Sequence, residues 1–125
     1  MTPEGKVKDK LRKLFKSLGA YYQAPIANGT SSSGAPDIFV LYKGVYFGVE
    51  AKATIKSKPR LNQLKHLVDI SNQGGAVFVI HDTNIDDLKQ ALTTVASPTF
   101  DRTLLAEIDH SAQLRATFQK ELDSL

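Results

Sequence analysis

The segment over residues 34–52, GAPDIFVLYKGVYFGVEAK, constrains the fold of this chain more than any other. Two runs of β-branched and aromatic residues flank a Lys-Gly pair at residues 43–44, which is the pattern of two antiparallel strands joined by a tight turn. A turn centred on that pair sets a register in which Asp37 faces Glu50. Because side chains alternate along a strand, both carboxylates and Lys52 then share one face of the hairpin, and the opposite face is apolar.

Two facing carboxylates are unusual, because like charges on opposed residues destabilise a pair of strands. At a separation of about 4 Å and an effective dielectric near 20, they repel by roughly 4 kcal/mol. A divalent cation would remove this repulsion, since Mg²⁺ binds carboxylate oxygens at about 2.1 Å. The alternative is a solvent-exposed polar face on which Asp37, Glu50 and Lys52 form an ordinary acid–base cluster. The hairpin alone leaves both interpretations open.

Length and composition favour a single domain in a reducing compartment. The chain has 125 residues, enough for one hydrophobic core. It has no cysteine, so neither disulfides nor thiolate metal sites hold the fold together, which fits the cytoplasm. No apolar run is long enough to cross a membrane, and the N-terminus lacks the apolar segment of a secretory signal. We therefore expect a cytoplasmic protein that contacts no membrane.

The basic residues are concentrated in the first half of the chain. Residues 1–60 hold 11 of the 16 Lys and Arg residues and four of the 13 Asp and Glu residues, a net charge of +7. Residues 61–125 hold five basic and nine acidic residues, a net charge of −4. This asymmetry favours a polyanionic partner, of which nucleic acid is the commonest, although a basic helix that merely faces solvent is the alternative.

Caps, turn residues and apolar periodicity predict the order of the elements. Thr2, Pro3 and Gly19 are typical of the two ends of a helix. The expected elements are a helix over residues 3–18, a strand over 20–26, a loop over 28–35, the hairpin, a helix over 60–72, a strand over 76–80, a helix over 85–95, and a helical tail. This order, α-β-β-β-α-β-α, predicts an α/β fold with a small mixed sheet flanked by helices. The single domain spans residues 1–125, with its core over about 3–96 and the tail over about 98–125.

Glu4 stands apart from the other charged residues of the first helix. At about 100° per residue it projects within the apolar stripe of Val7, Leu11 and Phe15, whereas the lysines occupy the rest of the circumference. A carboxylate near a helix N-terminus is favoured by the helix dipole, which is the structural interpretation. Its inward direction calls for a further role.

Together these residues resemble a known nuclease signature. Pro36-Asp37, twelve intervening residues and then Glu50-Ala51-Lys52 are similar to the motif of the PD-(D/E)XK nuclease superfamily. Glu4 on the first helix, Gln63 on the helix after the hairpin and the order of elements resemble the VRR-NUC group, particularly its stand-alone phage-type members. The resemblance covers about residues 3–82 and implies a restriction-endonuclease-like core that hydrolyses DNA phosphodiester bonds with Mg²⁺ or Mn²⁺.

The resemblance also implies roles for individual residues. The implied metal ligands are the side chains of Glu4, Asp37 and Glu50 and the backbone carbonyl of Ala51. Lys52 is the implied catalytic lysine, and because two adjacent carboxylates favour its charged form, we prefer a role in orienting water and stabilising transition-state charge over a role as base. The bound metal opposes that preference, so both roles stay open. Gln63 can hydrogen-bond the water or Lys52; a solvent-facing glutamine is the alternative.

Basic residues near this motif are expected to bind DNA. Lys6, Lys56, Lys58 and Arg60 can hold phosphates, which position the duplex without reading its sequence. We therefore expect a structure-selective endonuclease for branched DNA such as Holliday junctions, acting as a homodimer because cutting two strands needs two active centres. A phage-encoded enzyme would act in the host cytoplasm. The alternatives are a flap nuclease or exonuclease with the same site, and a non-catalytic nucleic-acid-binding module.

Overall fold

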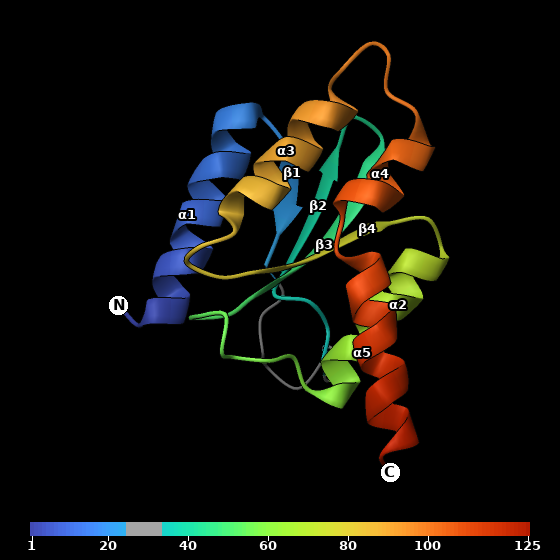
Figure 1. The fold of residues 1–125 in the computed structure, drawn as a ribbon. Helices are drawn as coiled ribbons and strands as arrows, with labels where there is room; N and C mark the ends of the chain where they lie inside the picture. The colour runs from blue at the N-terminus through green and yellow to red at the C-terminus, as the bar shows by residue number, and fades with distance from the viewer. Residues whose placement is uncertain (25–33) are drawn as a thin grey trace.

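The structure is a computed structural model that describes residues 1–24 and 34–125 (Figure 1). Its elements are α1 (Pro3–Leu18), β1 (Tyr21–Gln23), β2 (Ile38–Tyr42), β3 (Val45–Ala51), α2 (Leu61–Asn72), β4 (Ala76–Ile80), α3 (Ile85–Val95), α4 (Arg102–Ile108) and α5 (Ser111–Asp123). The predicted order of elements is confirmed. β1 is shorter than the strand predicted over 20–26, and residues 25 and 26 of that prediction lie outside the described residues. Residues 28–33 of the loop predicted over 28–35 also lie outside them.

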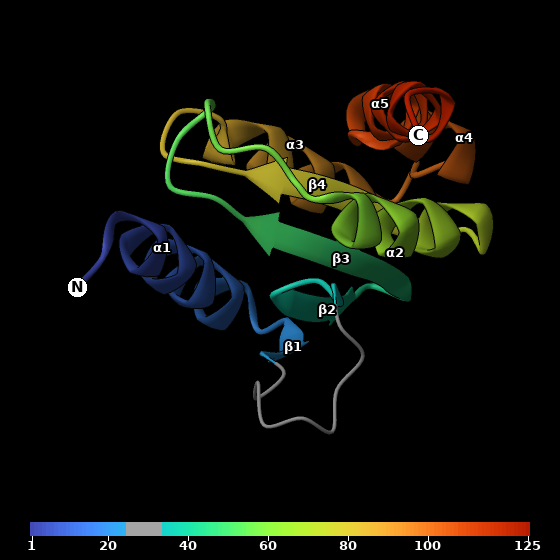
Figure 2. The ribbon, with the colours of Figure 1, turned by 90° about the horizontal axis from the view of Figure 1, so that it is seen from below.

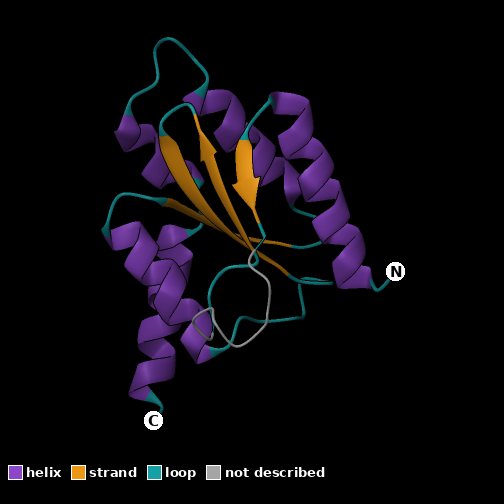
Figure 3. Cartoon of the chain, turned by 180° about the vertical axis from the view of Figure 1, so that it is seen from behind, coloured by secondary structure: helices purple, strands orange, loops and turns teal. Residues whose placement is uncertain are grey.

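The four strands form one mixed sheet in the order β1-β2-β3-β4 (Figure 3). The first three strands are antiparallel, and β4 runs parallel to β3. In the hairpin Tyr42 pairs with Val45 and Ile38 with Val49, which is the register predicted from the turn. Lys43 and Gly44 both have positive φ, of 51° and 77°, as the two central residues of a type I′ turn require.

Helices cover both faces of the sheet. Figure 2 shows α1 and α2 on opposite sides of β3. The larger hydrophobic cluster joins α1, α3 and α4 to the apolar face of the hairpin, through residues that include Leu11, Phe47 and Leu88. A smaller cluster joins Leu64 and Leu67 of α2 to Val77 and to Leu114 of α5. The predicted α/β architecture, a small mixed sheet between helices, is therefore confirmed.

The C-terminal tail is helical, as predicted, and consists of two helices, α4 and α5, separated at Asp109 and His110. The helix is interrupted at Asp109 and His110 because both residues hydrogen-bond to the free edge of β4. The backbone N–H of Val77 donates to Asp109 Oδ2 (3.2 Å), and that of Val79 donates to His110 Nδ1 (3.1 Å). The N–H of His110 donates to the carbonyl of Val77 (3.0 Å). Side chains thus replace the strand partner that an exposed sheet edge would otherwise recruit.

None of the helices in the two described ranges is long and apolar enough to span a lipid bilayer.

Candidate active site

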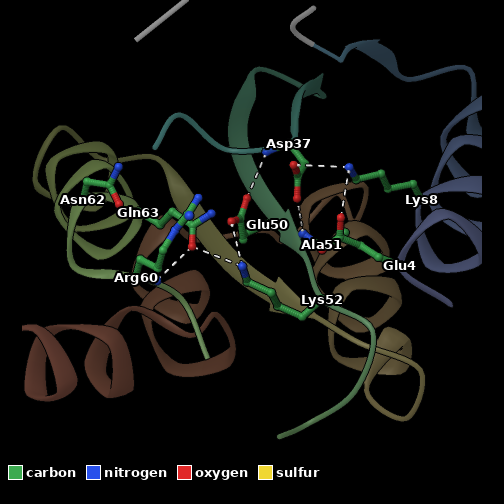
Figure 4. Close-up of polar contacts among 9 residues, drawn as sticks. All are labelled: Glu4, Lys8, Asp37, Glu50, Ala51, Lys52, Arg60, Asn62 and Gln63. Atoms are coloured by element: carbon green, nitrogen blue, oxygen red, sulfur yellow. Dashed lines mark hydrogen bonds and ion pairs between the residues drawn. The ribbon is translucent and has the colours of Figure 1, made fainter. Parts of the chain in front are cut away.

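Side chains from four parts of the fold converge where β2 begins and β3 ends (Figure 4). Asp37 directly precedes β2, and Glu50 and Ala51 are the last residues of β3. Lys52 follows β3. The site is completed by Glu4 and Lys8 from the first two turns of α1 and by Gln63 from the first turn of α2.

Asp37 and Glu50 are in contact at the end of the hairpin. The backbone N–H of Asp37 donates to Glu50 Oε1 (3.2 Å), and the N–H of Ala51 donates to Asp37 Oδ2 (2.8 Å). Glu50 is only 1% exposed, so its carboxylate is almost fully removed from water. The sequence left open an alternative in which this residue belongs to a solvent-exposed acid–base cluster. Burial to this extent excludes that alternative.

Burial raises the pKa of Glu50, and the negative charge of Asp37 raises it further, to about 8, although Lys52 acts in the opposite direction. Ionisation of both carboxylates is therefore unfavourable even with the two lysines nearby. Carboxylate and carbonyl oxygens are the ligands that Mg²⁺ and Mn²⁺ prefer. Asp37, Glu50 and the carbonyl of Ala51 thus offer the donor types that a divalent cation prefers. The charge of that cation would offset the repulsion between the two carboxylates.

Lys52 is held between β3 and α2. Its Nζ lies 3.5 Å from Glu50 Oε2 and donates to Gln63 Oε1 (3.1 Å), and its side chain is 14% exposed. Gln63 Oε1 also accepts from the backbone N–H of Arg60 (2.8 Å), which fixes the amide at the start of α2. Gln63 is 9% exposed, so the solvent-facing alternative for this residue is wrong. Its carbonyl oxygen instead fixes the position of the Lys52 ammonium.

Glu4 points into the same region but is linked to Asp37 through a lysine. Lys8 Nζ lies 3.4 Å from Glu4 Oε2 and 3.5 Å from Asp37 Oδ1. Burial would lower the pKa of Lys8, but the charges of Asp37 and Glu4 and their hydrogen bonds raise it above the ordinary value of 10.5. Within residues 1–24 and 34–125, no three carboxylate or imidazole side chains form a group that could hold a metal ion. Asp37 and Glu50 meet directly, whereas Glu4 meets the ammonium.

Sequence reasoning missed Lys8 as a member of this site. A signal existed, because Lys8 follows Glu4 by four residues and side chains at that spacing lie on the same helix face. The second pairing, to Asp37, depends on how α1 packs against the sheet and has no local signature.

The basic residues predicted to bind DNA are all exposed. Lys6 lies on α1, and Lys56 and Lys58 lie on the connector between β3 and α2, with Arg60 directly before α2. The same connector borders a groove of about 680 Å³ that is also lined by Lys120 of α5. Lys58 and Lys120 therefore line one groove from two different elements.

Comparisons with known proteins place the chain in a family. No protein-family model matches the chain, and no curated protein matches it. A solved structure described as a VRR_NUC domain is similar to this chain, with a TM-score of 0.64 and 33% sequence identity. The similarity covers 72% of this chain and 97% of that domain. The chain therefore belongs to the VRR-NUC family of nuclease domains, the group that its PD…EXK spacing and its order of elements predicted.

Proposed function

We propose that this protein is a Mg²⁺- or Mn²⁺-dependent DNA endonuclease that selects branched DNA, such as Holliday junctions, by its structure. Membership of the VRR-NUC family supports a nuclease. The observation that carries the proposal is the buried Glu50 carboxylate in contact with Asp37, next to an ammonium that Gln63 positions. Such an arrangement is costly for folding alone, because burial and like charge both oppose it.

The metal would be held by Asp37, Glu50 and the carbonyl of Ala51. Glu4 would join them from α1 once it is released from Lys8. A bound divalent cation supplies Lewis acidity: it polarises a phosphate oxygen and makes a bound water acidic enough to attack phosphorus at neutral pH. The protein contributes the fixed geometry, since the backbone N–H groups of Asp37 and Ala51 hold the two carboxylates in place.

Lys52 is the group best placed to act on the reacting phosphate. Its Nζ donates to Gln63 Oε1 and lies 3.5 Å from Glu50 Oε2, and an ammonium held in this way is suited to orienting the water and stabilising transition-state charge. Gln63 keeps this ammonium directed at the end of β3. We therefore assign Lys52 to charge stabilisation and Gln63 to the positioning of Lys52.

DNA would lie across the exposed cations on both sides of the site. Lys6, Lys56, Lys58 and Arg60 would contact phosphates, which favours recognition of DNA shape over sequence. A twofold homodimer would bring two active centres to the two strands of a junction. We place this activity in the cytoplasm, which fits a sequence without cysteine, and group the protein with the phage-type members of the family.

A cleavage panel tests the function. The purified protein is incubated with a four-way junction, a 5′ flap, a linear duplex and single-stranded DNA, each with Mg²⁺, with Mn²⁺ or with chelator. We expect paired incisions near the branch point of the junction, only when metal is present. Preferred cutting of the flap or progressive loss of nucleotides from duplex ends would support the flap nuclease or exonuclease alternative. Binding to the junction without cutting any substrate would instead indicate the non-catalytic module.

A further inference from the structure

One cation at the site has no part in the roles assigned above. Lys8 contacts two carboxylates at once, and its side chain is 28% exposed, so it is partly withdrawn from water. A second pair on α1 offers a comparison: Lys13 contacts Asp9 at 3.0 Å with the same spacing in the helix, but the Lys13 side chain is 76% exposed. The Lys8 interactions are therefore the more protected of the two, and only they reach another element.

The position of Lys8 is the notable feature. Its ammonium lies between Glu4 and Asp37, which are two of the carboxylates assigned to the metal. Glu50, on the other side of Asp37, forms an ion pair with Lys52. Three carboxylates thus face two ammonium groups. Lys8 alone forms ion pairs with both Glu4 and Asp37.

We propose that Lys8 is a built-in counter-cation that holds Glu4 and Asp37 in the metal-free protein and that a divalent cation must displace. This inference rests on the proposed metal site. A lysine suits the task, because its ammonium is a compact charge on a flexible stem and can leave without moving the helix. Lys8 therefore stabilises the unloaded site and weakens metal binding, so it sets the metal concentration at which the site fills.

The physical basis is competition for the same oxygens. A cation bound to Asp37 Oδ1 would take the atom that Lys8 contacts at 3.5 Å, and its double charge would repel the ammonium. Displacement costs the two ion pairs of Lys8. Both pairs are partly exposed and therefore weak, so removal of the competitor is expected to tighten metal binding by about fivefold, which corresponds to about 1 kcal/mol for the two pairs together.

The test measures Mn²⁺ binding by titration calorimetry together with thermal unfolding in chelator. Wild type is compared with Lys8→Met, with Lys8→Gln, which keeps a polar side chain without the charge, and with Lys13→Met as the matched control on the same helix. We expect both Lys8 variants to bind Mn²⁺ about fivefold more tightly than wild type. We also expect both to melt at a lower temperature than wild type in chelator and to gain more from added Mn²⁺. Lys13→Met should match wild type in Mn²⁺ affinity.

Each outcome decides one question. Equal or weaker Mn²⁺ binding by both Lys8 variants would overturn the counter-cation role while leaving the metal site intact. Unchanged melting of both Lys8 variants in chelator would overturn it as well. If folded wild type binds no Mn²⁺, the proposed metal site fails, and the role of Lys8 fails with it. If Lys8→Met does not fold in chelator, Lys8→Gln carries the comparison.

Discussion

At the scale of single residues, the central feature is a carboxylate that the fold buries at a cost. Glu50 is 1% exposed and contacts Asp37, and its pKa is raised to about 8 by burial first and by the charge of Asp37 second. Ionisation of Glu50 destabilises the folded state relative to the unfolded chain, because the carboxylate is hydrated only in the unfolded chain. A function that needs close carboxylates explains why the residue is kept.

The raised pKa of Glu50 predicts a pH dependence of stability. In the folded protein Glu50 holds its proton up to about pH 8, whereas in the unfolded chain it loses it near its ordinary value of 4.5. The folded state binds more protons between these values, so the free energy of unfolding falls as pH rises from about 4.5 to 8. In chelator, Glu50→Gln should lack this part of the decline and melt higher than wild type at pH 8.5.

The comparison requires melting curves of wild type and Glu50→Gln at pH 5.5 and 8.5, each with chelator and with excess Mg²⁺. The difference between the two proteins isolates Glu50 from every other titrating group. Mg²⁺ should raise the melting temperature of wild type more at pH 8.5 than at pH 5.5. Parallel declines of the two proteins with pH in chelator would contradict the raised pKa.

The residue-level geometry was partly predictable from the sequence. Alternation in the hairpin and a two-residue turn were enough to predict that Asp37 and Glu50 would lie together, because strand register is a local property. Lys8 was not predictable in the same way. Its contact with Asp37 depends on the angle at which α1 packs against the sheet, and the buried setting of Gln63 depends on where α2 begins relative to Lys52.

At the scale of elements, the edge of β4 shows how the tail completes the fold. The sequence predicted a helical tail, because Leu114, Phe118 and Leu122 recur at i, i+4 and i+8. The break at Asp109 and His110 is imposed by the unpaired backbone groups of β4, which lie far away in sequence. Apolar periodicity reports only on the local chain, so it predicted helix in the tail but could not place the boundary between α4 and α5.

Removal of the imidazole at this edge should destabilise the fold. His110 Nδ1 accepts from the N–H of Val79, and Nε2 contacts Asp87 Oδ2 at 2.9 Å, so the ring joins β4, α3 and the tail. His110→Ala leaves the Val79 N–H without its acceptor and is expected to lower the free energy of unfolding by about 2 kcal/mol. Urea denaturation measures the loss, with the exposed Glu107→Ala in α4 as the control. Equal free energies of unfolding for the two variants would contradict the role of His110 at the edge of β4.

At the scale of the whole molecule, α1, α2 and the ends of β2 and β3 bring the candidate site residues together. Glu4 and Lys8 reach the end of β3 from α1, and the exposed Lys56 and Lys58 lie on the connector that follows β3. Their placement supports the proposed path of a DNA backbone over the carboxylates, with two copies of the chain serving the two strands of a branched substrate. The family and the fold were predictable from motif and element order; the assembly and the preferred DNA structure are properties of surfaces that no motif encodes.

The most direct test of the proposed active site is the rate of junction cleavage in Mg²⁺ by wild type, Asp37→Asn, Lys52→Met and Asp9→Asn. Asn preserves the acceptor for the Ala51 N–H and removes only the charge, and Asp9 lies on α1 in a separate pair with Lys13. We predict that Asp37→Asn and Lys52→Met each cut about 100-fold more slowly than wild type or worse, while Asp9→Asn matches wild type. Cleavage by folded Asp37→Asn and Lys52→Met at the wild-type rate would contradict the assignment of this site.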